Sequence, residues 1–410
     1  MNDLAARAIS ATGMMTMVAI AWTASNDRRR VPWRIIFYGT AIQFGLALVM
    51  LRTEPGRRFF VAANDAVNGF IGYTDAGVRF VFGALVGTGF SFVINVLPII
   101  VFMGSLFAVF YHIGVIQPVV ALLARALARS LGISGAESLS AVANIFLGMV
   151  EAPLLIRPYL AAMTESELFC VMTTGMAGIA GSVLVAYVQM LGGGDFAGHL
   201  VISSILTAPA GILIAKVMVP ESGVPETGAS GHTIVEPTSL NLIDAAATGA
   251  ADGLRVAAYV GATLLAFVAA IAMLNDGLAA LGGLVGIEGL TLQRVLGLVM
   301  APIAWLMGIP WSEATQVGGL LGVKTVLNEF LAYQQLGELI KAGALSHRSA
   351  VIASYALCGF ANFGSLAILL GGLGGMAPTR RGDVARLGLR SILAGSLATF
   401  MTACIAGILL

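Results

Sequence analysis

Long runs of apolar residues, separated by shorter polar segments, dominate the pattern along this chain. A helix needs about 20 residues to cross the apolar core of a bilayer. Eight runs are close to that length and carry few charges, so the pattern predicts membrane-spanning helices. The predicted spans cover residues 6–24, 33–51, 88–113, 168–191, 197–219, 255–274, 349–372 and 387–409.

Three segments between these runs are too polar to span. Residues 55–80 and 116–131 have an amphipathic pattern, which is typical of helices that lie at a membrane surface. Residues 220–239 are rich in Pro, Gly, Ser, Thr and Glu, which indicates a linker. This linker divides the chain roughly in half.

The composition supports a polytopic membrane protein. Apolar residues make up 58% of the 410 residues and charged residues only 10%, against about 25% charged residues in a soluble domain. The net charge is +1, so there is no basic field to attract a nucleic acid. These values exclude a soluble enzyme, a disordered chain and a nucleic-acid binder.

The two halves of the chain contain a repeated segment. In the first half, residues 135–138 open a segment that ends at 148–153 and contains Glu151; in the second, residues 310–313 open one that ends at 326–330 and contains Glu329. Both segments are apolar, are interrupted by glycine and have the length of a hairpin that enters the membrane and returns. We therefore predict two re-entrant hairpins.

The span that follows each hairpin also repeats. Gly175–Ser182 resembles Gly359–Ser365, and both stretches place several small residues in the middle of an apolar run. Glycine weakens a helix by about 1 kcal/mol relative to alanine, so each span is predicted to break there. Inverted repeats with broken helices place a binding site near the middle of the membrane.

The predicted fold is therefore an all-α polytopic membrane protein. It has about eight transmembrane helices, two re-entrant helical hairpins in inverted repeats, and interfacial helices. The pattern divides the chain into N-terminal helices in residues 1–115, a first repeat in 116–219, a linker and further helices in 220–290, and a second repeat in 291–410.

Glu151 and Glu329 are the strongest chemical signals, because a carboxylate at membrane depth costs roughly 2.5 kcal/mol or more unless it is paired or hydrated. One interpretation is that each acid binds a polar solute or carries a proton. The alternative is that each caps a helix or pairs with Lys324 or Arg157.

Neutral polar side chains lie near these acids. Asn328, Asn362 and Ser365 offer amide and hydroxyl groups that suit a hydroxylated ligand, or that simply link helices. Phe360 can stack on a flat ring or pack in the core. Asn144 can offer an oxygen to a cation. The three cysteines and four histidines have no catalytic or metal-binding arrangement, so no enzyme and no cofactor is predicted.

Several motifs together resemble those of the concentrative nucleoside transporters of bacteria. They are Glu151-Ala152-Pro153 to Tyr159, Ile179-Ala180-Gly181-Ser182-Val183, Lys324-Thr325 with Asn328-Glu329-Phe330, Cys358-Gly359-Phe360-Ala361-Asn362-Phe363, and Arg386-Leu387-Gly388.

This resemblance implies a homotrimer in the bacterial inner membrane, with a scaffold and a mobile transport domain in each protomer. It assigns the N-terminal helices of residues 1–115 and the linker and helices of 220–290 to the scaffold, and the repeats of 116–219 and 291–410 to the transport domain. The transport domain moves like an elevator, driven by sodium in most members of the family and by protons in some. The resemblance places Glu329, Asn362 and Ser365 at the ribose with Phe360 nearby, Glu151 and Val183 at the nucleobase, and Asn144, Leu147, Gly178 and Ile179 at a sodium ion.

Two departures from the family pattern concern specificity. The family's Gly-Gln-Thr-Glu is here Gly148-Met149-Val150-Glu151, so two polar groups toward the base are replaced by Met149 and Val150. Gly178 stands where the family usually has a hydroxyl side chain. The first departure predicts an altered base preference, and the second removes one oxygen from the cation site.

The leading hypothesis is a secondary active nucleoside symporter, with sodium favoured over the proton as coupling ion. The alternative within the same class is a cation-coupled symporter of another polar metabolite with a remodelled base pocket. An intramembrane enzyme that uses Glu151 and Glu329 as an acid/base pair, and a channel, are rival hypotheses. The inverted repeat argues against the enzyme, because chemistry does not require access from two sides.

Overall fold

The computed structural model of this 410-residue chain describes residues 3–87, 91–228, 239–284, 286 and 289–410. Every regular element in these ranges is helical. The elements are α1 (Asp3–Thr23), α2 (Trp33–Arg52), α3 (Glu54–Phe82), η1 (Gly83–Gly87), α4 (Phe92–Asn95), α5 (Leu97–His112), α6 (Ile116–Leu131), α7 (Gly135–Ala143), α8 (Glu151–Leu154), η2 (Arg157–Tyr159), α9 (Glu165–Ala177), α10 (Gly181–Met190), α11 (Phe196–Met218), α12 (Leu242–Leu284), α13 (Leu292–Leu306), α14 (Trp311–Val326), α15 (Glu329–Lys341), α16 (His347–Leu357), α17 (Phe363–Met376), η3 (Pro378–Arg380) and α18 (Arg381–Leu409).

Seven helical segments within the described ranges are long and apolar enough to cross a membrane. The number is eight if α13 and α14, which are bent by 116° at a short break, count as one span. The predicted class, an all-helical polytopic membrane protein, is therefore confirmed. The seven segments are α1, α2, α4 with α5, α9 with α10, α11, α12, and η3 with α18.

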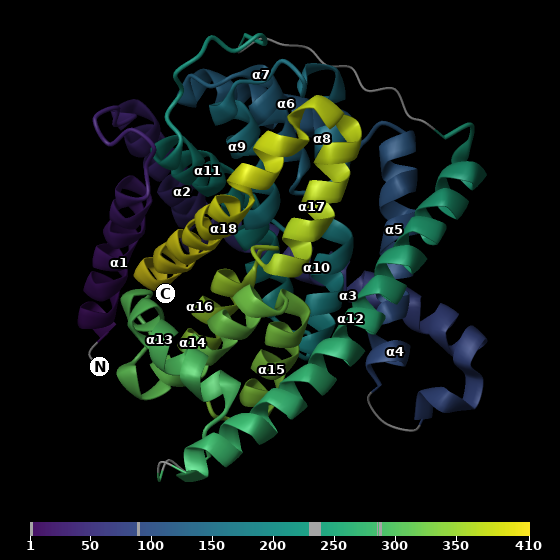
Figure 1. Ribbon diagram of the computed structural model, residues 1–410. Helices are drawn as coiled ribbons and strands as arrows, with labels where there is room; N and C mark the ends of the chain where they lie inside the picture. The colour runs from purple at the N-terminus through teal and green to yellow at the C-terminus, as the bar shows by residue number, and fades with distance from the viewer. Residues whose placement is uncertain (1–2, 88–90, 229–238, 285, 287–288) are drawn as a thin grey trace.

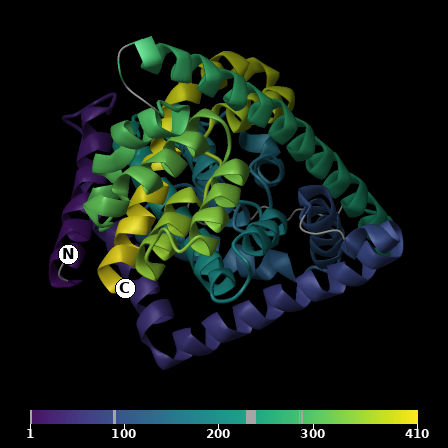
Figure 2. The same ribbon diagram turned by 90° about the horizontal axis from the view of Figure 1, so that it is seen from below.

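The helices form a densely packed centre beside long peripheral helices. Figure 1 shows α18 in the middle of the molecule, with α1 on one side and α12 crossing obliquely on the other. In Figure 2, α3 and α12 run along two edges and the helices of the second half lie between them. The two ends of the chain are close together, since the Arg7 guanidinium donates to the Leu410 carbonyl at 3.0 Å.

Both predicted helix breaks are present. The run at 168–191 forms α9 and α10, with residues 178–180 between them, and the run at 349–372 falls within α16 and α17, with residues 358–362 between them. Small residues allow the close approach that each break requires. A Cβ on Gly359 would lie 2.6 Å from the Ala177 carbonyl oxygen, so the two breaks touch.

Other boundaries differ from the sequence prediction. The run at 255–274 is only the apolar part of α12, which extends over Leu242–Leu284. Asp252, just before this run, pairs at 3.1 Å with Arg255, its first residue, and both side chains remain exposed. Of the predicted linker, residues 220–228 carry no helix, and 229–238 lie outside the described residues.

Two further helices follow the amphipathic predictions closely. Residues 55–80 lie within α3 and residues 116–131 coincide with α6. The helix α5 packs against α12 through small residues, because a Cβ on Gly253 would lie 2.8 Å from the Ile100 carbonyl oxygen. Such contacts let membrane helices approach closely. These two helices form one wall of the site described below.

Two helix–turn–helix segments bring the predicted acids to the interior. The first hairpin segment consists of α7, residues 144–150 and α8; the second consists of α14, residues 327–328 and α15. Ser134 and Glu137 form a capping box that begins α7, and Asn328 caps α15 by accepting from the Leu331 N–H at 2.9 Å. Glu151 and Glu329 are each the first residue of the second helix.

Candidate functional site

A cavity of about 440 Å³ lies between the two hairpin segments on one side and α5 with α12 on the other. Its lining is mostly apolar, with a few polar groups that converge, which is the usual character of a small-molecule site. Nine of the residues predicted for the site line this cavity. They are Leu147, Met149, Val150, Glu151, Val183, Glu329, Phe360, Asn362 and Ser365.

Glu329 is the centre of the polar groups. It is 3% exposed, and its two carboxylate oxygens accept different donors. The Tyr187 hydroxyl donates to Oε1 at 2.9 Å, and the Asn362 amide donates to Oε2 at 2.7 Å. A carboxylate has about four acceptor positions, so two remain for hydroxyl groups of a ligand.

Asn362 is held by the helix that it begins. Its Oδ1 accepts from the Ser365 N–H at 2.8 Å, which caps α17, while its Nδ2 reaches Glu329 on α15. One amide therefore caps a helix and links the break of the second half to the second hairpin segment. Asn328 also lines the cavity, so the cap and ligand interpretations of these amides are compatible.

Glu151 lies on the opposite hairpin segment and is exposed to the cavity. Its carboxylate folds back toward Gly148, where a Cβ would lie 2.1 Å from Oε2. Met149 and Val150 line the same wall. Val150 also packs toward α17, since a Cβ on Gly372 would lie 2.9 Å from its methyl groups.

Of the four residues predicted for a cation, Leu147 lines the cavity, and Asn144, Gly178 and Ile179 lie close to its lining residues along the chain. Asn144 is 4% exposed; its Nδ2 donates to the Thr174 carbonyl at 3.0 Å, and its Oδ1 has no hydrogen-bond partner among the described residues. A Cβ on Gly178 would lie 2.3 Å from that Nδ2, so the Asn144 amide packs directly against this glycine. A buried free amide oxygen beside carbonyl groups fits a hard cation. Leu147 and Ile179 flank this point along the chain.

Lys324 does not form the pair with Glu329 that the sequence left open. Its ammonium, which is fully buried, donates to the Ala356 carbonyl at 2.8 Å and to the Thr399 hydroxyl at 3.0 Å. Phe360 lines the cavity and is partly buried in the core, and its N–H donates to the Gly178 carbonyl at 3.3 Å.

Sequence reasoning did not find Tyr187, nor the residues that α5 and α12 contribute. Tyr187 is fully buried and stacks on Tyr333, with ring centroids 4.4 Å apart. Tyr111 on α5 and Tyr259 on α12 line the cavity opposite the hairpin segments. An aromatic residue in an apolar run has no distinguishing sequence signal, so only the packing reveals these positions.

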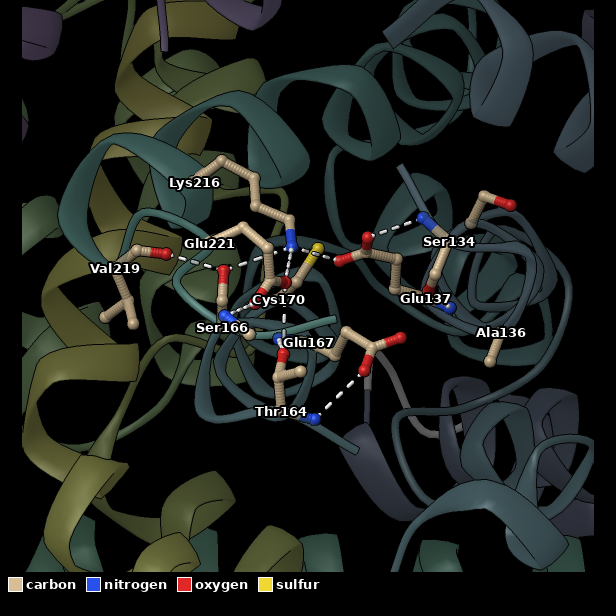
Figure 3. Close-up of polar contacts among 12 residues, drawn as sticks. Ser134, Ala136, Glu137, Thr164, Ser166, Glu167, Cys170, Lys216, Val219 and Glu221 are labelled. Carbon is tan, nitrogen blue, oxygen red and sulfur yellow. Dashed lines mark hydrogen bonds and ion pairs between the residues drawn. The ribbon is translucent and has the colours of Figure 1, made fainter. Parts of the chain in front are cut away.

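A buried charge cluster fixes the start of the first hairpin segment. Figure 3 shows the Lys216 ammonium between Glu137, Glu221 and Ser166. Lys216 lies 2.7 Å from Glu137 and 3.2 Å from Glu221, and donates to the Ser166 hydroxyl at 3.1 Å. Glu137 is 1% exposed. The cluster therefore ties α7 to α9, α11 and the segment that follows α11.

Three family models match successive parts of the chain. They are the N-terminus of the Na+ dependent nucleoside transporters over residues 12–85, a nucleoside recognition (Gate) model over 93–194, and the C-terminus of the Na+ dependent nucleoside transporters over 199–407. The chain belongs to the sodium-dependent nucleoside transporter family. The resemblance in the sequence is thus confirmed.

Curated relatives of this transporter align with nearly its whole length. An uncharacterized transporter, YutK, of Bacillus subtilis is 44% identical over 398 residues, which are 96% of this chain and 97% of that protein. Sodium/nucleoside cotransporter 1 of Mus musculus is 41% identical over an alignment of 418 residues, which covers 98% of this chain but 63% of that longer protein.

Solved structures give the same result. CNTnw in an inward-facing substrate-bound state has a TM-score of 0.91 and 45% identity, with 98% of each chain covered. A variant of CNTnw in an outward-facing state has a TM-score of 0.93 and 45% identity, with 99% of each chain covered. The family consists of transporters rather than enzymes, and sodium is its coupling ion.

Proposed function

We propose that this transporter is a secondary active symporter that takes up nucleosides across the bacterial inner membrane, driven by the sodium gradient. The observation that carries the proposal is the polar cluster of Glu329, Asn362 and Ser365 at the cavity. An anionic acceptor next to an amide suits the vicinal hydroxyl groups of a ribose. Glu151 and Val183 on the opposite side of the cavity are then placed for the base.

We assign the sodium ion to Asn144, Leu147, Gly178 and Ile179. The free Oδ1 of Asn144 supports this assignment, because a buried acceptor without a partner is costly unless a ligand satisfies it. The ion supplies positive charge and order at the first hairpin segment. Gly178 has no side-chain oxygen, so the protein ligands to the ion are backbone carbonyl oxygens and the Asn144 side-chain oxygen.

We further propose elevator-type alternating access within a homotrimer. The helices α5 and α12 line one side of the cavity and the helices of the two repeats line the other, so we place the boundary between the fixed and the moving group along it. Solute and cation together favour the closed, mobile state, since a ligand shifts an equilibrium only by its differential affinity for the two states. In this division α5 and α12 belong to the scaffold.

A second candidate function is symport of another polar metabolite. Met149 and Val150 give the cavity an apolar wall where the family usually carries polar groups toward the base. A base edge left without a partner loses about 1–3 kcal/mol. A purine or a less polar ring is therefore favoured, and a solute without a usual base is the alternative.

Uptake by purified protein in proteoliposomes tests the proposal. We expect a nucleoside to accumulate when an inward sodium gradient is applied and not when choline replaces sodium. Glu329→Gln and Asn362→Ala should abolish uptake while the protein stays folded. Glu338→Gln is a matched control, because Glu338 lies exposed on the same helix, α15. Wild-type uptake by Glu329→Gln would refute the role of this acid.

A panel of ligands distinguishes the two candidates. A ligand that binds only the folded protein raises its stability by RT ln(1 + [L]/Kd), so thermal shift needs no assumption about coupling. Stabilisation by one class of nucleosides, enhanced by sodium, supports nucleoside symport. No effect of nucleosides, nucleobases or ribose in either salt would favour another polyhydroxylated solute.

A further inference from the structure

A glycine leaves a small niche on the side of the cavity proposed for the ribose. Gly364 is the second residue of α17 and lines the cavity next to Asn362, the N-cap of that helix. Outside the backbone next to Gly364, no atom of the described residues lies closer than 3.4 Å to the point where a Cβ on Gly364 would be. A methyl or hydroxyl group therefore fits at this point, which we call the Gly364 niche.

Oxygen atoms from three elements surround the niche. Asn362 Oδ1 lies 3.4 Å from the Cβ point, the Leu327 carbonyl oxygen 3.9 Å and the Tyr259 hydroxyl 4.0 Å. These atoms belong to the start of α17, to the second hairpin segment and to α12. A hydroxyl group placed in the niche would thus face hydrogen-bonding atoms from both sides of the cavity.

The Tyr259 side chain has an unused hydrogen-bonding group. Tyr259 lines the cavity and is 46% exposed. Its backbone carbonyl accepts from the Thr263 hydroxyl at 2.9 Å, but its own hydroxyl has no hydrogen-bond partner among the described residues. A phenol hydroxyl can donate one hydrogen bond and accept others. The group is therefore available to a solute.

The ribose of a nucleoside carries a vicinal pair of hydroxyl groups on C2′ and C3′ and a further hydroxyl group on C5′. The proposed contacts with Glu329 and Asn362 account for the vicinal pair. The 5′-hydroxyl stands on a carbon outside the ring, so it extends beyond these contacts. The Gly364 niche is directly beside Asn362 and offers this group a place with oxygen atoms around it.

We propose that Tyr259 is a specificity-determining residue, whose hydroxyl binds the 5′-hydroxyl of the nucleoside in the Gly364 niche. The inference rests on the proposed function, because it requires a ribose at Glu329 and Asn362. Tyr259 lies on α12, which we assign to the scaffold, whereas the other ribose contacts belong to the moving repeats. The contact therefore crosses the proposed boundary, and it selects nucleosides with a free 5′-hydroxyl over their 5′-deoxy analogues.

A double-mutant cycle between protein and ligand tests this contact. We expect the wild type to bind a 5′-deoxynucleoside about three- to tenfold more weakly than the parent nucleoside, because one hydrogen bond is lost. Tyr259→Phe should weaken binding of the parent by a similar factor and reduce the discrimination between the two ligands about threefold or more. Tyr111→Phe removes a hydroxyl from α5 on the same cavity and should keep the wild-type discrimination.

Gly364→Ala tests the niche itself. Gly364 is helical and is not in the left-handed region, so alanine suits its backbone. The added methyl group fills the niche, and we expect the nucleoside to bind about tenfold or more weakly while the melting temperature does not fall. Gly371→Ala is the matched control on α17, because no atom of the described residues lies within 4 Å of its Cβ point. This control should keep wild-type affinity.

The outcomes separate this contact from the proposed function. If the wild type binds no nucleoside, the proposed function fails and the contact fails with it. If the wild type binds nucleosides but Tyr259→Phe discriminates as the wild type does, only the contact is refuted. Reduced discrimination against 2′-deoxy or 3′-deoxy analogues instead, or wild-type affinity in Gly364→Ala, would also overturn it. If Gly364→Ala is not obtained as folded protein, Tyr259→Phe decides, since it removes only one exposed hydroxyl group.

Discussion

Glu329 binds a different protein donor with each of its carboxylate oxygens, Tyr187 at Oε1 and Asn362 at Oε2. Glu329 faces the cavity, and Tyr187, which is not among the lining residues, orients it from behind. A hydrogen bond to a charged group contributes about 1.5–3 kcal/mol. We predict that Tyr187→Phe raises the KM for the nucleoside about tenfold or more and changes kcat less, as measured by initial rates of uptake.

Tyr333→Phe is the matched control for Tyr187→Phe. Tyr333 stacks on Tyr187, but its hydroxyl donates to the Ser354 carbonyl at 2.7 Å instead of to Glu329. This control should lower the melting temperature and leave KM unchanged. If Tyr187→Phe behaves in the same way, its hydroxyl supports the packing and does not position the acid.

Met149 and Val150 lead to a prediction about specificity. Both line the cavity beside Glu151, and neither can donate or accept a hydrogen bond with its side chain other than weakly. Met149→Gln combined with Val150→Thr adds two polar groups on this wall. We expect the preference between nucleobases to change by about tenfold in a competition assay, since one buried hydrogen bond accounts for 1–3 kcal/mol.

Leu154→Gln is the control for that double variant. Leu154 also lines the cavity from the first hairpin segment, so it adds an amide to the same wall at a different position. An unchanged substrate profile in the double variant, or the same change in Leu154→Gln, would refute a specific contact between residues 149–150 and the base.

The sequence predicted those site residues whose chemistry conflicts with their surroundings. Glu151, Glu329 and Asn362 interrupt apolar runs, and a polar group at membrane depth requires a reason. Tyr187 does not stand out in the sequence, because an aromatic residue is common in an apolar helix. Its role depends on which residue of α15 lies opposite, which is a property of the packing.

Among the helices, α11 carries the charge on which the first hairpin segment depends. Lys216 joins Glu137 of α7 to Glu221 after α11, and both Lys216 and Glu137 are buried (Figure 3). Removing one partner of a buried pair leaves the other without compensation, which costs about 3–5 kcal/mol. We predict that Lys216→Met lowers stability by that amount, as measured by thermal unfolding in detergent.

Glu137→Gln combined with Lys216→Met separates the pair from its surroundings. The combined variant should be less destabilised than Lys216→Met alone, because neither charge is then buried without a partner. Arg255→Met on α12 serves as the control. Its pair with Asp252 is exposed, so the loss should stay within about 1 kcal/mol. Equal effects of Lys216→Met and Arg255→Met would show that the buried cluster contributes no more than a surface pair.

The positions of helices and of their breaks were easier to predict from the sequence than the residues at which helices begin and end. Apolar runs correctly placed seven of the eight predicted spans, and clusters of small residues placed both breaks. The run at 349–372 falls on α16 and α17, which are not among the described segments that are long and apolar enough to cross a membrane. The start of α12 was missed because Asp244 and Asp252 interrupt the apolar pattern before residue 255, while the backbone is helical through both. Hydropathy records contact with lipid or protein, whereas helix formation continues wherever residues such as alanine and leucine allow it.

Over the whole molecule, the cavity lies between two groups of helices that differ in how deeply they are buried. In an apolar stretch of 18 residues, 89% of the positions are buried in α9 with α10, in α11 and in η3 with α18. In α2 and α12 the corresponding shares are 17% and 22%. Exposed apolar side chains on the peripheral helices require lipid or further copies of the chain to cover them. This contrast supports the proposed division into a buried moving group and a peripheral scaffold, and the proposed association of copies through that scaffold.

Coupling between the two ligands is a property of the whole transporter. If sodium and nucleoside favour the same closed state, each must raise the affinity for the other by the same factor, typically 5–150-fold. We predict that the ratio of the nucleoside Kd in choline to that in sodium equals the ratio of the sodium Kd without nucleoside to that with nucleoside, as measured by isothermal titration calorimetry. Asn144→Ala should reduce both ratios together.

A nucleoside Kd that is the same in sodium and choline would refute sodium coupling at equilibrium. At a fixed pH the two ratios must be equal even if a proton is also bound, because the four binding steps form a closed cycle. Unequal ratios would therefore show that a titration had not reached equilibrium. Repeating the titrations at two pH values tests for a coupled proton, since a proton linked to either ligand makes the ratios depend on pH. Equal ratios that do not change with pH would leave sodium as the ion that closes the site around the nucleoside.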